Sequence, residues 1–177
     1  FDLRCIHGQS ALLDVLRRES LQGSMANGIF LAHMANNALK RRPPLSVFGR
    51  ISSARSGEHR GTIDIKHLAI APIVDLARIH ALAGGLDAVN TDERLASAGR
   101  STAMSEQGAR DLREALEFLA ALRIRHQTRQ ILAGLTPDSY LRTDELSNFE
   151  RAQLKDALKV VADMQEALGQ RYQVGHF

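Results

Sequence analysis

Two long stretches of this chain repeat apolar residues at steps of three and four, and these repeats constrain the fold more than any other feature. In residues 105–134 the spacing places one apolar stripe along one face of a helix. This stripe contains Leu112, Ala115, Leu116, Leu119 and Leu122. The second stretch follows Ser147 and Glu150, which have the spacing of a capping box. Its apolar positions are Ala157, Leu158, Val161, Met164, Leu168 and Tyr172. Helices of this kind bury their apolar faces against one another, so the repeats predict an antiparallel helical bundle.

Shorter segments complete the predicted fold. Helices are expected at residues 10–19, at residues 29–42 before two prolines, from Pro72 to two glycines at 84–85, and from about Asn90. A loop is expected at residues 23–28. The alternating segments 45–52 and 62–68 are separated by a Ser/Gly-rich stretch and predict a β-hairpin. The predicted fold class is mainly α, an antiparallel four-helix bundle with one small β-hairpin.

The apolar stripe of the first long helix becomes polar towards its C-terminal end. Arg123, His126 and Gln130 take the positions where the repeat would continue, and Gln127 lies at the margin. One interpretation is that the helix extends past the core and these side chains meet water. The other is that they line a polar cleft, where arginine and carboxamide groups would donate hydrogen bonds to a phosphate or a base edge. Elsewhere, His80 is expected in the core and Arg78 in solvent.

Composition limits the partners, metal sites and cellular locations that we expect for this chain. The net charge is +3 and no dense basic stripe carries interleaved aromatics, so nucleic acid is not expected as a partner. No apolar run reaches the ~18 residues of a membrane span, and the single cysteine, Cys5, favours a cytoplasmic location. The seven histidines have no metal-ligand spacing, so no metal site is expected. The start "FDLRCIHG" has no initiator Met, and we expect the chain to be a fragment of a larger protein.

Five strings in a fixed order resemble the nucleotidyltransferase substrate-binding domain of bacterial signal-transduction proteins. They are "PPLSVFGRI", "GTIDIKHLAIAPIVDLARIHAL", "NTDERL", "DLREALEFLAALRIRHQ" and "LSNFERAQLKDALKVVADMQEAL", within residues 43–172. In such proteins the domain follows a nucleotidyltransferase domain related to the protein-PII uridylyltransferase, and CBS or cyclic-nucleotide-binding modules commonly precede both. The start of the chain resembles the last strand and helix of that catalytic domain, whose Asp-x-Arg pattern is matched by Asp2 and Arg4. The resemblance implies a catalytic-domain remnant at residues 1–42 and a substrate-binding domain at residues 43–177.

The resemblance also implies a role. It describes a non-catalytic fragment that binds the nucleotide or the acceptor for the upstream nucleotidyltransferase domain. The implied binding residues are Arg123, His126, Gln127, Gln130, Asp64 and Lys66. The Asp-x-Asp pair that holds two metals in the wider superfamily is absent, so no catalytic residue, metal or cofactor is expected in this fragment. For the parent protein the resemblance implies Mg²⁺ and a nucleoside triphosphate, with Asp2 as a possible third carboxylate.

Other readings stay open at this point. The chain can instead be a regulatory interaction module whose helices dock on CBS or cyclic-nucleotide-binding domains. Asp64 and Lys66 can equally form a surface pair of little energetic consequence. A helical ribonuclease that uses an Arg-x(4–6)-His motif is disfavoured, because the spacing from Arg60 to His67 falls in the predicted hairpin.

Overall fold

The computed structural model describes residues 2–3, 5–46, 48–54 and 56–173. Within them the chain is mainly helical with one small antiparallel β-sheet, which confirms the predicted fold class. The elements are α1 (Ser10–Ala26), α2 (Gly28–Ala38), β1 (Thr62–Asp64), a π-helical segment (Lys66–Ile70), α3 (Ala71–Ala83), α4 (Thr91–Gly99), α5 (Glu106–Leu132), β2 (Tyr140–Arg142), a 3₁₀ turn (Thr143–Glu145) and α6 (Asn148–Arg171).

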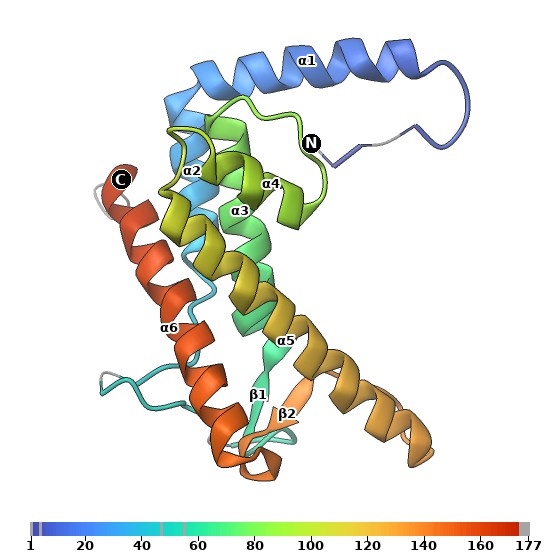
Figure 1. The fold of residues 1–177 in the computed structure, drawn as a ribbon, viewed down its shortest axis with the longest axis vertical. Helices are drawn as coiled ribbons and strands as arrows, with labels where there is room; N and C mark the ends of the chain where they lie inside the picture. The colour runs from blue at the N-terminus through green and yellow to red at the C-terminus, as the bar shows by residue number, and fades with distance from the viewer. Residues whose placement is uncertain (1, 4, 47, 55, 174–177) are drawn as a thin grey trace.

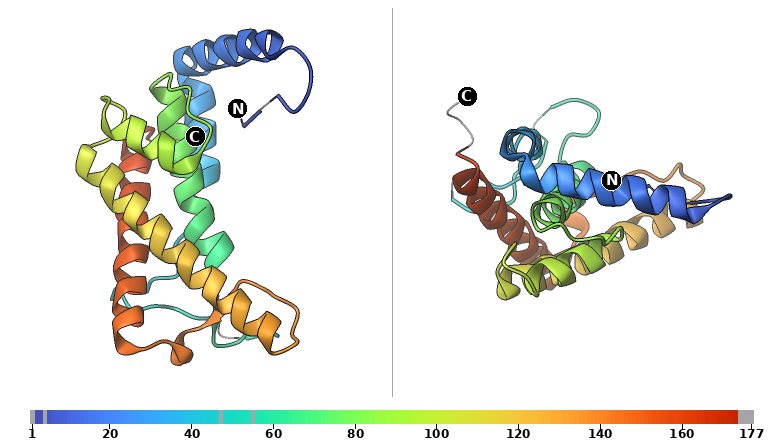
Figure 2. Two further views of the ribbon diagram at one scale, coloured as in Figure 1. Left: turned by 45° about the vertical axis from the view of Figure 1, so that its right-hand side comes forward. Right: turned by 90° about the horizontal axis from the view of Figure 1, so that it is seen from above.

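The bundle is built from α3, α4, α5 and α6, and α2 packs against α3 and α6. Helices α5 and α6 run in opposite directions, and α5 crosses the molecule diagonally to end beyond the other helices (Figure 1). Helix α1 lies across one end of the bundle, whereas β1 and β2 lie at the other end (Figures 1 and 2). The core is closed by large apolar side chains with under 2% of their surface exposed. They include Ile63, Ile65, Ile73, Leu76, Leu95, Leu112, Leu119, Leu154 and Leu158.

The predicted starts of α4, α5 and α6 have side-chain caps. Ser147 and Glu150 form a reciprocal capping box at the start of α6, and the Ser105 hydroxyl accepts the N–H of Gly108 at the start of α5. The Asn90 side chain accepts two backbone N–H groups of α4. These contacts satisfy donors that the first turn of a helix leaves without partners.

The predicted strand pairing is wrong in one respect. The strand β1 pairs with β2, with Ile63 opposite Leu141, and not with residues 45–52. That segment instead closes on itself through a bridge between Leu45 and Ile51. The extended run also stops at Asp64, where the chain becomes helical. A helix from this point places Ile65, Ala69 and Ile73 on one face, and all three are buried. The Asp64 side chain also caps this helix by accepting the N–H of His67 at 3.0 Å.

The first two helices also differ from expectation. Helix α1 runs on to Ala26 without the predicted loop, and Ser24 is buried with its hydroxyl bonded to Ser20 O at 2.7 Å. The break is the single residue Asn27, whose side chain accepts the N–H of Phe30 and caps α2. Helix α2 ends at Ala38, four residues early, and the carbonyl there accepts a hydrogen bond from the side chain of Gln165 at 3.2 Å.

Candidate functional site

The polar stripe of α5 faces the segment that returns from the end of this helix to β2. Arg123 Nε donates to Ser139 Oγ at 3.2 Å, and Gln130 Oε1 accepts the N–H of Asp138 at 2.9 Å. His126 Nε2 lies 3.1 Å from Asp138 Oδ1. These three side chains of α5, and Gln127 beside them, are partly buried. The stripe therefore does face inwards, but against the chain itself.

Asp138 is the centre of this group of contacts. The same Oδ1 also accepts the N–H of Tyr140 at 2.9 Å. Burial disfavours the charged carboxylate, but the hydrogen bonds from Tyr140 and His126 outweigh it, so the pKa of Asp138 lies below its ordinary value. The contacts hold the returning segment on α5.

The other two predicted binding residues lie on the neighbouring strand end. Asp64 Oδ2 is 2.8 Å from His67 Nδ1, so the partner of Asp64 is His67. The side chain of Lys66 is exposed. Ile65 donates its N–H to Ser139 O at 3.0 Å. The segment around Ser139 is therefore bordered by the polar stripe of α5 and by the strand end that carries Asp64 and Lys66.

Asp2 lies far from this region along the bundle, between two arginines. Its Oδ2 accepts from Arg78 Nη2 at 2.8 Å, and its Oδ1 accepts from Arg94 Nη2. Arg78 also bonds to Asp75 at 3.0 Å, and Asp75 pairs with Arg41 at 3.3 Å. The four residues Asp2, Arg78, Asp75 and Arg41 thus form a chain of alternating charges, with Arg94 at its end. Arg4, the other half of the predicted Asp-x-Arg pattern, lies outside the described residues.

The charge of Asp2 is stabilised by its neighbours. Partial burial of the carboxyl group opposes ionisation, but hydrogen bonds and charges of Arg94 and Arg78 outweigh it, so the pKa of Asp2 lies below its ordinary value. Only 4% of the Arg94 side chain is exposed, against 25% for Arg78 and 48% for Asp2. The carboxylate therefore covers a guanidinium that is otherwise within the protein.

Sequence reasoning missed both arginines. Arg78 does not lie in solvent as expected but is held by Asp2 and Asp75. The signal for Arg94 was present, since it lies next to Leu95 and four residues before Ala98, on the buried face of α4. A charged residue on an apolar face requires a partner in the fold.

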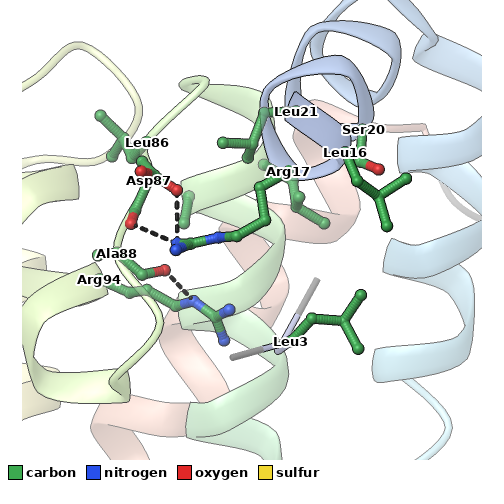
Figure 3. Close-up of a pocket in the computed structure, with 11 residues that line it drawn as sticks. Leu3, Leu16, Arg17, Ser20, Leu21, Leu86, Asp87, Ala88 and Arg94 are labelled. Carbon is green, nitrogen blue, oxygen red and sulfur yellow. Dashed lines mark hydrogen bonds and ion pairs between the residues drawn. The ribbon is translucent and has the colours of Figure 1, made fainter. Parts of the chain in front are cut away.

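A pocket next to Asp2 is enclosed by α1, the end of α3 and the segment leading into α4 (Figure 3). Its cavity volume is only about 20 Å³, roughly the room that one water molecule needs. Two guanidinium groups lie at its wall. Arg17 bonds to Asp87 Oδ1 at 2.5 Å, and Arg94 Nε donates to Ala88 O at 2.9 Å. The remaining lining is mostly apolar and includes Leu3, Leu16, Leu21, Leu82 and Leu86.

His80 is a core residue, as expected. Only 6% of it is exposed, and Nδ1 lies 2.7 Å from the carbonyl oxygen of Ala103. That oxygen also accepts from Arg171 at 2.8 Å. Burial lowers the pKa of His80. Its Nε2 has no hydrogen-bond partner among the described residues.

Two absences hold for the described part of the chain. No group of three or more His, Cys, Asp or Glu side chains there is arranged to hold a metal ion. None of its helices is both long and apolar enough to cross a membrane.

Comparison with known protein families gives a match. The model of a family described as "Putative nucleotidyltransferase substrate binding domain" matches residues 28–172. No curated protein and no solved structure matches the chain. The matched residues include Arg78, Arg94 and the polar end of α5, whereas Asp2 and α1 lie before them.

Proposed function

The chain belongs to this family of nucleotidyltransferase substrate-binding domains, and on that premise we propose that it binds a nucleotide or an acceptor for a nucleotidyltransferase domain without itself transferring the nucleotidyl group. One observation carries the proposal. The pocket beside Asp2 combines the guanidinium groups of Arg17 and Arg94 with apolar walls such as Leu16. A substrate with an anionic group has complementary chemistry, because guanidinium groups donate charged hydrogen bonds to phosphate and carboxylate oxygens. Its apolar part would pack on the exposed side chains of Leu3 and Leu16.

The proposal extends to the parent protein. We take its catalytic domain to lie upstream, to be related to the protein-PII uridylyltransferase and to use Mg²⁺ and a nucleoside triphosphate. Asp2 would be its third carboxylate, and residue 42 would divide the two domains. The contact of Asp2 with Arg78 and Arg94 supports this arrangement, because Asp2 precedes the matched residues and both arginines are among them. We further propose a cytoplasmic role in bacterial signal transduction, with CBS or cyclic-nucleotide-binding modules as partners and no nucleic acid.

The polar end of α5 stays a predicted binding site of its own, for the nucleotide or for the acceptor. Arg123 and His126 already bond to the returning segment, so a ligand there would lie over Ser139 and Asp138. Lys66 is exposed beside them and is available to an anionic group. The full predicted set is Arg123, His126, Gln127, Gln130, Asp64 and Lys66.

Isothermal titration with ATP, UTP, CTP and GTP tests the proposed function. We expect at least one of them to bind, and Arg17→Gln to weaken binding about tenfold or more through loss of one charged hydrogen bond. Arg113→Gln is the matched control, since Arg113 forms an exposed pair with Asp92 at 2.6 Å. Urea denaturation checks that each variant is folded. Equal affinities in the folded Arg17 and Arg113 variants would reject the pocket as the nucleotide site.

A second function, the interaction module, is favoured by one feature of α1. Leu12, Val15 and Leu16 lie at steps of three and four on this helix and are 73%, 49% and 50% exposed. An apolar helix face of this kind is typical of a docking surface. Under this reading Leu12→Asp abolishes binding of the chain to a CBS or cyclic-nucleotide-binding domain, measured by surface plasmon resonance, and leaves nucleotide titration unchanged.

A further inference from the structure

The carboxylate of Asp2 is held by two arginines that come from different helices. Arg78 on α3 donates to one carboxylate oxygen and Arg94 on α4 donates to the other. Two guanidinium groups on separate oxygens of one anion form the arrangement that binds phosphate groups in proteins, since each of these groups offers several acceptor oxygens. The site therefore has the chemistry of an anion site, and Asp2 is the anion in it.

The carboxylate of Asp2 is held less firmly than the two arginines that bind it. Nearly half of the Asp2 side chain is exposed, whereas Arg94 is almost fully buried and Arg78 is three-quarters buried. Each arginine has a second contact that does not depend on Asp2, namely Asp75 for Arg78 and the carbonyl of Ala88 for Arg94. Each guanidinium group therefore has a hydrogen-bond partner besides the carboxylate, and solvent reaches the carboxylate.

We propose that Arg78 and Arg94 form a phosphate-binding site that Asp2 occupies in the ligand-free chain, and that the phosphate group of a ligand displaces Asp2 from it. A di- or triphosphate carries more charge than a carboxylate and offers more acceptor oxygens, so it competes effectively for the same donors. The pocket of Figure 3 adjoins this site through Arg94, and the exposed side chains of Leu3 and Leu16 at its wall would contact the remainder of the ligand. The inference rests on the proposed function only in naming a nucleotide as the source of the phosphate.

The test is the affinity of the 177-residue chain for inorganic pyrophosphate, measured by isothermal titration without divalent metal. Asp2→Asn removes the competing charge and keeps the side-chain shape, so pyrophosphate should bind at least fivefold more tightly. Arg78→Gln removes one donor, so binding should weaken at least tenfold. Circular dichroism shows whether each variant retains its helices. Arg78 is chosen over Arg94 because it is the less buried of the two.

The exposed ion pair of Asp92 and Arg113 supplies matched controls with the same charge changes. Asp92→Asn and Arg113→Gln should leave the pyrophosphate affinity within about twofold of the wild type, because they change net charge without touching the site. If Asp2→Asn and Asp92→Asn shift the affinity equally, or if neither the wild type nor Asp2→Asn binds pyrophosphate, the inference is wrong.

Titration with UTP then separates the displacement of Asp2 from the proposed nucleotide-binding function. A nucleotide that binds with no response to Asp2→Asn rejects the displacement and leaves the proposed function standing. Pyrophosphate that responds as expected, with no nucleotide bound, supports the displacement and rejects the nucleotide as ligand.

Discussion

Arg17 and Arg94 at the pocket and Arg78 beside Asp2 differ in how deeply they are buried, and therefore in how much they depend on their partners. Arg17 is at the surface of the pocket and pairs with Asp87, so it is partly hydrated. Arg94 is 4% exposed, and a guanidinium at that depth is stable only when charged and polar groups surround it. Its contacts with Asp2 and Ala88 meet this need. Substitution of Arg94 is therefore expected to affect folding, whereas Arg17 and Arg78 can be changed to probe binding.

His80 gives a prediction at the residue scale. Burial lowers its pKa below the ordinary value of 6.5, so the unfolded chain takes up a proton at a pH where the folded chain does not. The free energy of unfolding should therefore fall as the pH drops below about 6.5, by up to ~1.4 kcal/mol per pH unit for this one group. We expect His80→Leu to remove that part of the slope, measured by urea denaturation between about pH 5 and 8.

An exposed histidine serves as the control for this pH dependence. His33 is exposed on α2, and His33→Leu should retain the wild-type slope. The carbonyl of Ala103 keeps its bond from Arg171 when His80 is replaced, so no buried acceptor is left without a partner. A His80→Leu protein with the same slope as the His33 variant would show that burial of His80 does not govern the acid response.

Residue-level patterns located part of the candidate site. Asp2 was identified through its resemblance to a strand pattern. Of the two interpretations of Arg123 and His126, the one in which they face inwards agrees with their partial burial. The partners of Asp2 could not be deduced, because Arg78 and Arg94 lie on different helices and meet only when α3 packs on α4. Ligand binding by Arg123 and its neighbours stays a prediction.

Two glycines give a prediction at the scale of helices. A methyl group added at Gly99 would lie 2.6 Å from Ala109 Cβ, so Gly99→Ala should push α4 from α5 and cost ~1–3 kcal/mol. Nothing lies within 4 Å of the same position at Gly23 in α1. Gly23→Ala should instead stabilise by about 0.5–1 kcal/mol through helix propensity. Thermal unfolding of both variants checks the opposite signs, and equal shifts would mean that close packing of α4 on α5 is not limiting.

The segment that joins α5 to β2 gives another prediction. Asp138 accepts hydrogen bonds from Tyr140 N–H and His126, so Asp138→Ala should cost about 1–3 kcal/mol and loosen the segment. Asp144 is a suitable control, because it is exposed and pairs only at the surface with Arg142. We expect Asp144→Ala to leave stability unchanged. Hydrogen exchange should also be faster at Tyr140 in the Asp138 variant alone, and unchanged exchange there would contradict the proposed role of Asp138.

Sequence patterns predicted elements best where local chemistry decides their position. The starts of α4, α5 and α6 follow from Asn90, Ser105 and Ser147, whose side chains cap their own helices. The partner of β1 could not be found in this way, because β2 is only three residues long and far along the chain. Its place is set by its pairing with β1, where Ile63 lies opposite Leu141, and this is a long-range contact.

At the scale of the whole molecule, the two regions of interest lie at opposite ends of the bundle. Helix α4, which carries Arg94, is close to α1, whereas β1 and β2 and the end of α5 lie at the other end (Figure 1). One small ligand cannot contact both. A nucleotide in the pocket beside Asp2 would therefore leave the polar end of α5 for a different partner, and each region can be tested with its own variants.

The final prediction concerns transfer activity. No Asp-x-Asp pair follows a Gly-Ser motif anywhere in the 177 residues. The chain therefore lacks the carboxylate pair that would hold two metal ions for nucleotidyl transfer. In addition, the single carboxylate proposed to belong to the parent site, Asp2, is paired with Arg78 and Arg94. We therefore expect nucleotide binding without transfer. Incubation with radiolabelled ATP, UTP, CTP or GTP and Mg²⁺ or Mn²⁺ should leave both protein and added acceptor unlabelled, while titration under the same conditions detects a bound nucleotide. Stoichiometric label that persists in Asp2→Asn would assign catalysis to other residues of this chain, and label that disappears in Asp2→Asn would make Asp2 catalytic in its own right.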